Sequence, residues 1–136
     1  MDYLYHFVRK YPFSLLCFAA IWYLSLIFNA PETPLNEIKL IDKWVHIVMY
    51  GGTCTVLWVE YIRQHQRLNY KKLTIWAWLA PIVMSGVIEL LQAYCTTNRN
   101  GDWYDMTANA IGVTLAVGIG LVIWKTQASS IKQKDL

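Results

Sequence analysis

Several ionisable residues stand at short spacing within segments that are otherwise apolar. Asp42 and His46 are four residues apart, which places them on one face of a helix, and Lys43 lies beside them. An imidazole beside a carboxylate is a common arrangement for general acid–base chemistry, in which the carboxylate orients the ring. We therefore interpret His46 as a candidate proton-transfer residue and Asp42 as the group that orients it.

A second polar group follows further along the chain. Glu89 and Gln92 are three residues apart, and Ser85 precedes Glu89 by one helical turn, so these side chains share a face. A carboxylate that is partly desolvated within a bilayer can act as a general acid or base. Glu89 is therefore predicted to complement His46.

A third polar group surrounds the start of the last apolar segment. Arg99 is followed by Asp102 and Asp105, and Asn109 continues the face of Asp105 one turn later. A guanidinium can clamp a phosphate or carboxylate in a fork geometry that lysine cannot match, and lipid-linked substrates carry such groups. Asp105, Asp102 and Glu89 could instead hold a divalent cation or an ammonium group, because hard oxygen ligands suit magnesium or calcium. No spacing in the set defines a metal site, so the sequence leaves the cofactor unknown.

We combine these groups into one candidate site. The predicted catalytic residues are Glu89, His46, Asp105 and Asp42, and the predicted substrate-binding residues are Arg99, Gln92, Asn109, Lys43 and Asp102. The alternative is a buried hydrogen-bond network that only fastens helices together. Interhelical polar bonds average only about 0.6 kcal/mol, whereas each ionisable group placed in a bilayer costs at least about 2.5 kcal/mol. Such a set of charges exceeds what fastening requires, so we favour a functional site.

The elements that position these residues are apolar segments of membrane-spanning length. The 136-residue chain is 56% apolar and only 15% charged, against about 25% charged residues in soluble proteins. A spanning helix needs about 20 mainly apolar residues. Four segments qualify, namely residues 12–29, 43–62, 73–94 and 104–124. The sequence therefore predicts one domain that is an all-α integral membrane four-helix bundle, with the third helix kinked at Pro81.

The distribution of Lys and Arg predicts the orientation of this bundle. In a four-span arrangement nine basic residues fall on one side, and only Lys39, Lys43 and Arg99 fall on the other. Basic residues near helix ends are retained in the cytoplasm, so both termini are predicted to be cytoplasmic in a bacterial inner membrane. The candidate site, with Trp103 and Tyr104 beside it, then lies at the external face. The net charge of +3 follows this topology and does not suggest nucleic acid as a partner.

Small residues recur at every fourth position in the last segment. They are Ala108, Gly112, Ala116 and Gly120, and they share an arc with Asp105 and Asn109. Small residues let helix backbones approach closely in lipid. The arc is therefore predicted to be a buried seam, which turns Asp105 and Asn109 toward the helices that carry His46 and Glu89.

Glu60 and the cysteines are predicted to lie outside the site. Glu60 is about 27 Å from Asp42 at 1.5 Å per helical residue, so we expect it to form a surface ion pair with Arg63 instead. The three cysteines have neither metal-binding nor disulfide spacing, and we interpret them as packing residues.

The order of the polar residues resembles that of the VanZ-like membrane protein family. The resemblance rests on Asp42, Lys43, His46, Tyr50, Glu89, Gln92, Arg99, Asp102, Asp105, Asn109 and Gly112, and it covers about residues 42–120. It implies a four-helix integral membrane protein related to a factor that raises resistance to the glycopeptide antibiotic teicoplanin, and it implies no particular reaction. One departure is local, because Thr97 and Asn98 stand where a proline–glycine turn often precedes the arginine. This departure is expected to affect how the loop presents Arg99.

Two functions are predicted from these features. The first is an enzyme or binding site at the external leaflet for a lipid-linked or cell-envelope substrate, or for a glycopeptide. The second is a non-enzymatic protein that binds membrane lipids and recruits a partner in envelope assembly through exposed Trp103 and Tyr104. A channel or transporter is disfavoured because no polar path joins the site to Glu60.

Overall fold

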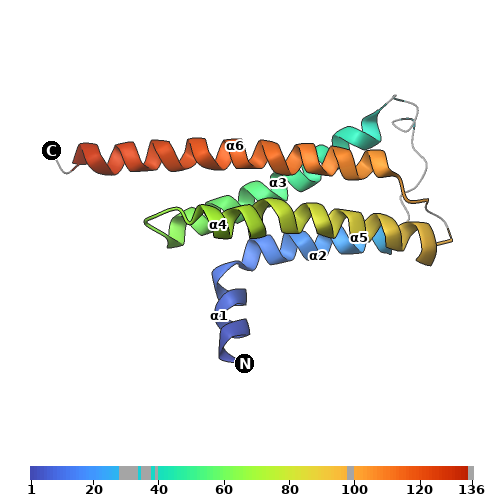
Figure 1. The fold of residues 1–136 in the computed structure, drawn as a ribbon, viewed down its shortest axis with the longest axis horizontal. Coiled ribbons are helices and arrows are strands. Elements are labelled where there is room, and N and C mark those ends of the chain that lie inside the picture. Colours follow the sequence, from blue (N-terminus) through green and yellow to red (C-terminus); the bar gives the residue numbers. More distant parts are fainter. Residues whose placement is uncertain (28–33, 35–37, 39, 98–99, 135–136) are drawn as a thin grey trace.

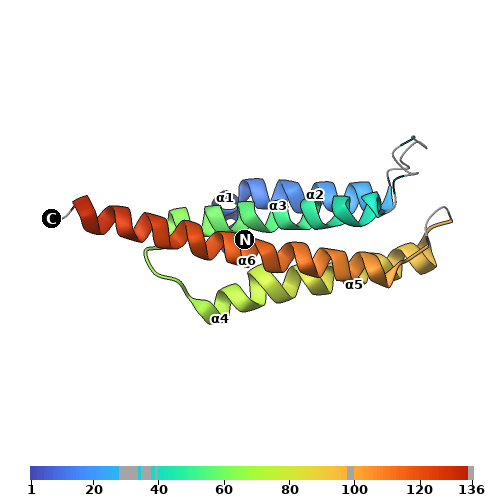
Figure 2. The same cartoon turned by 90° about the horizontal axis from the view of Figure 1, so that it is seen from above.

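The computed structural model describes residues 1–27, 34, 38, 40–97 and 100–134. Throughout these residues the regular structure is helical, without a strand. The elements are α1 (Asp2–Lys10), α2 (Pro12–Leu26), α3 (Ile41–Gln64), α4 (Tyr70–Leu73), the π-helical turn η2 (Thr74–Leu79), α5 (Ala80–Cys95) and α6 (Trp103–Lys134). Figures 1 and 2 show α2, α3, α5 and α6 lying side by side, with α1 turned away from them. The predicted all-helical fold is confirmed.

Within the described part of the chain, three helical segments are long and apolar enough to cross a membrane. They are Ile41–Gln64, Tyr70–Cys95, which joins α4, η2 and α5, and Trp103–Ile131. The fourth predicted segment, α2, is a shorter apolar helix of 15 residues. Apolar side chains such as Val48, Leu90 and Leu115 are exposed on the helices, whereas several polar side chains are buried. That arrangement suits a surrounding of lipid, so the chain is a membrane protein.

The helix ends differ from the predicted ones in ways that the local sequence explains. Pro12 occupies the first turn of α2, as predicted, because an N–H group is not needed there. Residues 28 and 29 of that predicted segment lie outside the described residues. The last helix continues well beyond Trp124, to Lys134, because the Lys, Gln and Ala residues there favour helix. Its 32 residues span about 48 Å, so it projects beyond a hydrocarbon core of about 30 Å.

The patterns of the sequence do not predict α1. Its residues Tyr3, His6, Phe7 and Lys10 share one helix face, and its last turn carries Arg9 beside Lys10. All nine residues of α1 are exposed, and the helix is too short to cross a bilayer. A short amphipathic helix with basic residues is typical of segments that lie in the membrane interface.

The predicted interruption near Pro81 takes the form of a π-helical turn. η2 ends just before α5, whose first turn contains Pro81. The Ala80 N–H donates to the Ile75 carbonyl, five residues back, which widens the helix at this point. A wider turn separates the proline ring from the carbonyl with which it would clash in a regular helix. The proline therefore alters the helix one turn before its own position.

α3 and α6 form the most extensive helix pair, and they meet along the predicted small-residue seam. A Cβ atom added at Gly112 would meet the Ile47 carbonyl oxygen and would lie 3.0 Å from the Gly51 nitrogen. The alanines of the seam, Ala108 and Ala116, are 4% and 0% exposed. The predicted buried seam is confirmed, because small residues allow the two backbones to touch.

The structure overturns the predicted role of Glu60. Its side chain is buried and accepts hydrogen bonds from the backbone N–H groups of Phe13 and Ser14, at 3.0 and 3.1 Å. The Ser14 hydroxyl donates to the same carboxylate. These donors belong to the first turn of α2, where N–H groups lack partners within the helix and carry partial positive charge. Glu60 therefore caps α2 from α3, and the ion pairs within the described part of the chain do not join it to Arg63.

Candidate functional site

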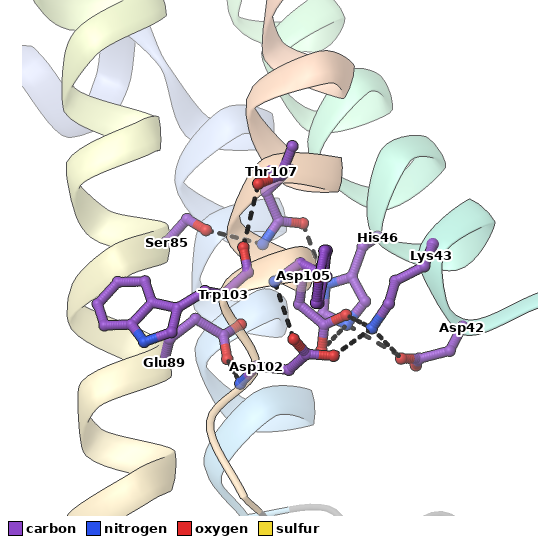
Figure 3. A network of polar contacts seen from close by, with 11 residues as sticks. Asp42, Lys43, His46, Ser85, Glu89, Asp102, Trp103, Asp105 and Thr107 are labelled. Atoms are coloured by element: carbon purple, nitrogen blue, oxygen red, sulfur yellow. Dashed lines mark hydrogen bonds and ion pairs between the residues drawn. The ribbon is translucent and has the colours of Figure 1, made fainter. Parts of the chain in front are cut away.

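A network of polar side chains lies at the end of the molecule where α3 begins, α5 ends and α6 begins (Figure 3). Helices α1 and α4 lie toward the opposite end, together with the C-terminal part of α6 (Figure 1). The network therefore draws on three helices and is confined to one end of the molecule, where the sequence predicted a common site.

Lys43 of α3 links the acidic groups of the network. Its ammonium donates to Asp102 at 2.6 Å and to Asp42 at 3.3 Å, and it also contacts the Asp105 carboxylate. Asp105 is buried in α6, whereas the Asp42 side chain is 66% exposed. The hydrogen bond from Lys43 holds the pKa of Asp102 below its ordinary value, so that carboxylate is charged. Lys43 thus holds three carboxylates together instead of standing free.

Asp102 contacts all three helices through separate atoms. Its backbone N–H donates to Glu89 Oε2 at 2.8 Å, which ties the segment before α6 to α5. Its Oδ1 atom accepts from the Tyr104 N–H at 2.8 Å and caps the start of α6. Its Oδ2 atom accepts from Lys43 of α3. Asp102 is therefore placed to position the helices around the site.

Glu89 is buried in the second half of α5, with 3% of its surface exposed. Its contact with the Asp102 N–H requires the chain before α6 to pass close to α5. Gly101 permits this approach, because a Cβ atom there would meet the Glu89 carbonyl oxygen and would lie 3.0 Å from Ala93. Gly101 is not among the residues predicted from the sequence, although a glycine directly before a helix-capping aspartate is a signal for such a close approach.

A chain of hydrogen bonds crosses from α3 through α6 to α5. His46 Nδ1 lies 3.0 Å from Asn109 Oδ1, and Asn109 Nδ2 donates to Ser85 Oγ at 2.7 Å. Asn109 and Ser85 are 1% and 0% exposed, so water does not compete for these bonds. Because the amide oxygen of Asn109 can only accept, His46 Nδ1 must donate. Asn109 therefore determines which nitrogen of the imidazole carries its proton.

The other ring nitrogen of His46 faces two carboxylates. Nε2 lies 3.5 Å from Asp105 Oδ2 and 3.8 Å from Asp42 Oδ1. A lone pair on Nε2 would be repelled by these oxygens, whereas a second ring proton or a bound cation would be attracted. Asp105, which is closer to the ring and buried, is better placed than Asp42 to pair with it. The arrangement can hold an exchangeable proton between imidazole and carboxylate, as general acid–base chemistry requires.

Two predicted site residues are not placed in this network, and one unassigned residue is. Gln92 is buried, but its amide donates to the Ser25 carbonyl at 2.8 Å, so it fastens α5 to α2. Arg99 lies outside the described residues. Ser85, which is predicted only to share the helix face of Glu89, ends the hydrogen-bond chain from His46.

One group of the described residues could hold a metal ion, namely Asp42, His46 and Asp105. One ligand atom from each lies within 4.8 Å of the others. This group differs from the all-oxygen set considered from the sequence, because it includes an imidazole nitrogen. Imidazole suits zinc or iron better than magnesium or calcium. Lys43 bonds to both carboxylates, so an ion at this point would have to displace its ammonium.

The helices and the network together define the class of the protein, an all-helical membrane protein with a charged, hydrogen-bonded site at one end. Comparison of the chain with family models, with curated proteins and with solved structures finds no match.

Proposed function

We propose that the chain is a VanZ-like protein whose four apolar helices cross the bacterial inner membrane, with both termini in the cytoplasm. The network around His46 is then a site at the external face that acts on, or binds, a lipid-linked or cell-envelope substrate. Protection against a glycopeptide such as teicoplanin is the expected consequence in the cell. The resemblance of the polar residues to the family and the convergence of most of them at one end support this proposal.

The observation that carries the proposal is the orientation of the His46 ring. Asn109 holds Nδ1, and Asp105 stands 3.5 Å from Nε2, so proton exchange is confined to the Nε2 side. A network that only fastened helices would not need a titratable ring, because uncharged amides could join the same helices at lower cost. The His46 side chain is 14% exposed, which leaves access for a substrate. The reaction class supported is proton transfer by His46, with Asp105 stabilising the imidazolium.

The charges around the ring favour a substrate with a cationic or hydrogen-bond-donating group. Among the described residues of the network, the carboxylates of Asp42, Glu89, Asp102 and Asp105 outnumber the ammonium of Lys43. Asp42 is the most accessible acceptor, since 66% of its side chain is exposed. An amine or amide N–H group of an envelope precursor or glycopeptide would find acceptors here.

The proposed orientation is supported by the basic residues at the end opposite the site. Arg9 and Lys10 end α1, and Lys71 and Lys72 lie in α4. Basic residues flanking spanning helices are retained in the cytoplasm. This end is therefore assigned to the cytoplasm, and the His46 site to the external side.

Protection is expected to depend on the charges of the site. Asp105→Asn and Glu89→Gln keep the side-chain shape but remove a carboxylate, and loss of acid–base catalysis costs about 10²-fold or more in rate. In a host that relies on this chain, we expect teicoplanin susceptibility to return to that of cells without it. Glu60→Gln, a buried carboxylate at the opposite end, is the matched control and should protect fully. Full protection by both site variants, at normal amounts in the membrane, would refute the site.

The orientation is tested by labelling cysteines in right-side-out membrane vesicles. Cys95 is exposed at the site end, and Cys54 is buried. An impermeant maleimide should label Cys95 in sealed vesicles. A Cys95→Ser/Ser129→Cys variant has its exposed cysteine in the C-terminal part of α6, and the maleimide should label that cysteine only after permeabilisation. The opposite pattern would reverse the proposed orientation.

The second candidate function is a non-enzymatic binder that recruits an envelope partner. Trp103 and Tyr104 favour it, because they are 61% and 77% exposed at the start of α6 beside the site. Exposed aromatic residues are common anchors in binding surfaces. If the protein is a binder, alanine at both Trp103 and Tyr104 should remove protection, and Asp105→Asn should leave protection intact. This is the reverse of the result expected for the acid–base site.

A further inference from the structure

A cavity of about 760 Å³ lies among α1, α2, α3 and the α4–α5 segment. Its walls include Lys10, His65 and Lys72, which belong to the end opposite the His46 site. Figure 2 shows the α4–α5 segment standing away from α6 at α4 and lying along it further on. A volume of this size is within the range of about 300–1,000 Å³ that is typical of small-molecule sites.

Much of the lining of the cavity is apolar. It includes Leu15 and Phe18 of α2 and Trp76, Ala77 and Met84 of the α4–α5 segment. Trp76 and Ala77 belong to the π-helical turn, so the widened turn forms part of this lining. The interior thus matches a hydrocarbon chain and offers little to a small polar ligand.

The charged groups of the cavity are all basic. Lys10 and Lys72 contribute ammonium groups from α1 and α4, and His6 and His65 add imidazoles. No carboxylate belongs to the described residues that line the cavity. Glu60 lies behind Ser14, where its oxygens accept hydrogen bonds from the first turn of α2. An anionic group on the ligand would therefore meet two ammonium groups without a competing acid in the wall.

We propose that this cavity binds an anionic phospholipid, with an acyl chain between α2 and the η2–α5 wall and the phosphate against Lys10 and Lys72. The apolar lining and the two ammonium groups together require one ligand that has both a long apolar part and a negatively charged head group. Basic pockets at the ends of spanning helices bind anionic head groups, and the basic amphipathic α1 lies where such head groups lie. The proposal concerns the opposite end from the His46 site and does not depend on its function.

Binding is tested on the purified full-length chain in detergent, by native mass spectrometry and thermal unfolding with added phosphatidylglycerol or phosphatidylcholine. We expect retained phosphatidylglycerol and a larger rise in Tm with it than with phosphatidylcholine. Lys10→Gln/Lys72→Gln should reduce the preference for phosphatidylglycerol on the order of tenfold. The matched control is Arg9→Gln/Lys71→Gln, which removes two charges from adjacent positions that do not line the cavity. Its preference should equal that of the unmodified chain.

A variant that fills the cavity gives an independent test of the acyl-chain part. Ala80 lines the cavity and is partly exposed, so Ala80→Trp should block lipid retention while both lysines remain. Leu115→Trp adds a similar ring to an exposed position of α6 outside the cavity and should retain lipid normally. Equal stabilisation by the two lipids, equal loss in the two charge variants, or normal retention by Ala80→Trp would each overturn the proposal.

Discussion

A chain carrying Gly112→Val is expected to lose about 3 kcal/mol or more in the free energy of unfolding. Its Cβ would meet the Ile47 carbonyl oxygen and would lie 3.0 Å from the Gly51 nitrogen. Both are backbone atoms of α3, so neither can rotate away as the end of a side chain would. The two helices must therefore separate. Because His46 belongs to α3 and Asp105 to α6, this separation also increases the distance between their side chains.

Gly118→Val is the matched control for this change. Gly118 lies in the same helix, but a Cβ atom there meets nothing within 4 Å. Both substitutions alter helix propensity equally, so the difference between them isolates the helix contact. Thermal unfolding in detergent, followed by circular dichroism, should show a large fall in Tm for Gly112→Val and little change for Gly118→Val. Similar Tm values for the two variants would contradict the close α3–α6 contact.

Glu60→Ala is the second change for which a large loss of stability is expected. It removes the acceptor for the Phe13 and Ser14 N–H groups and for the Ser14 hydroxyl. Each buried donor left without a partner costs about 1–3 kcal/mol, so a total loss of at least about 3 kcal/mol is expected for the three donors. Glu60→Gln keeps an acceptor oxygen and should lose much less. The measurement is again the Tm in detergent.

A double-mutant cycle separates this cap from the surface ion pair suggested by sequence spacing. Glu60→Ala should cost less in a Ser14→Ala background, because the two residues share one interaction. Arg63→Gln should have little effect, since Arg63 is exposed. If Arg63→Gln cost as much as Glu60→Ala, and the cycle showed no coupling to Ser14, the cap would be contradicted.

Much of the site could be predicted because its parts are local to single helices. His46 and Asp42 share a face through their spacing of four residues, and Asp105 and Asn109 share another. The small residues of the last helix identify the arc that meets a neighbouring backbone, which orients those side chains inward. The sequence therefore predicts which polar residues turn toward one another, although it predicts neither the hydrogen bonds nor the atoms involved.

The partners that were predicted wrongly or missed lie on other helices. Glu60 bonds to Ser14 across 46 residues of sequence, and Gln92 bonds to Ser25 across 67. Spacing rules identify neighbours within one helix, so they suggested Arg63 as the partner of Glu60 and did not identify Ser25 as a partner of Gln92. Gly101 was not predicted for the same reason. The backbone that lies close to it belongs to another helix, α5.

The sequence by itself determined the helical class and the long apolar segments. A helix in lipid must satisfy its own backbone hydrogen bonds, so a membrane-spanning helix is recognisable from its length and hydropathy alone. It also determined the small-residue seam of the last helix. Only the tertiary structure decided that Asn109 holds the His46 ring, that Glu60 caps α2, and that a cavity lies beside the π-helical turn. Those features depend on the rotation and offset of each helix against its neighbours, which are set by packing between segments distant in the chain.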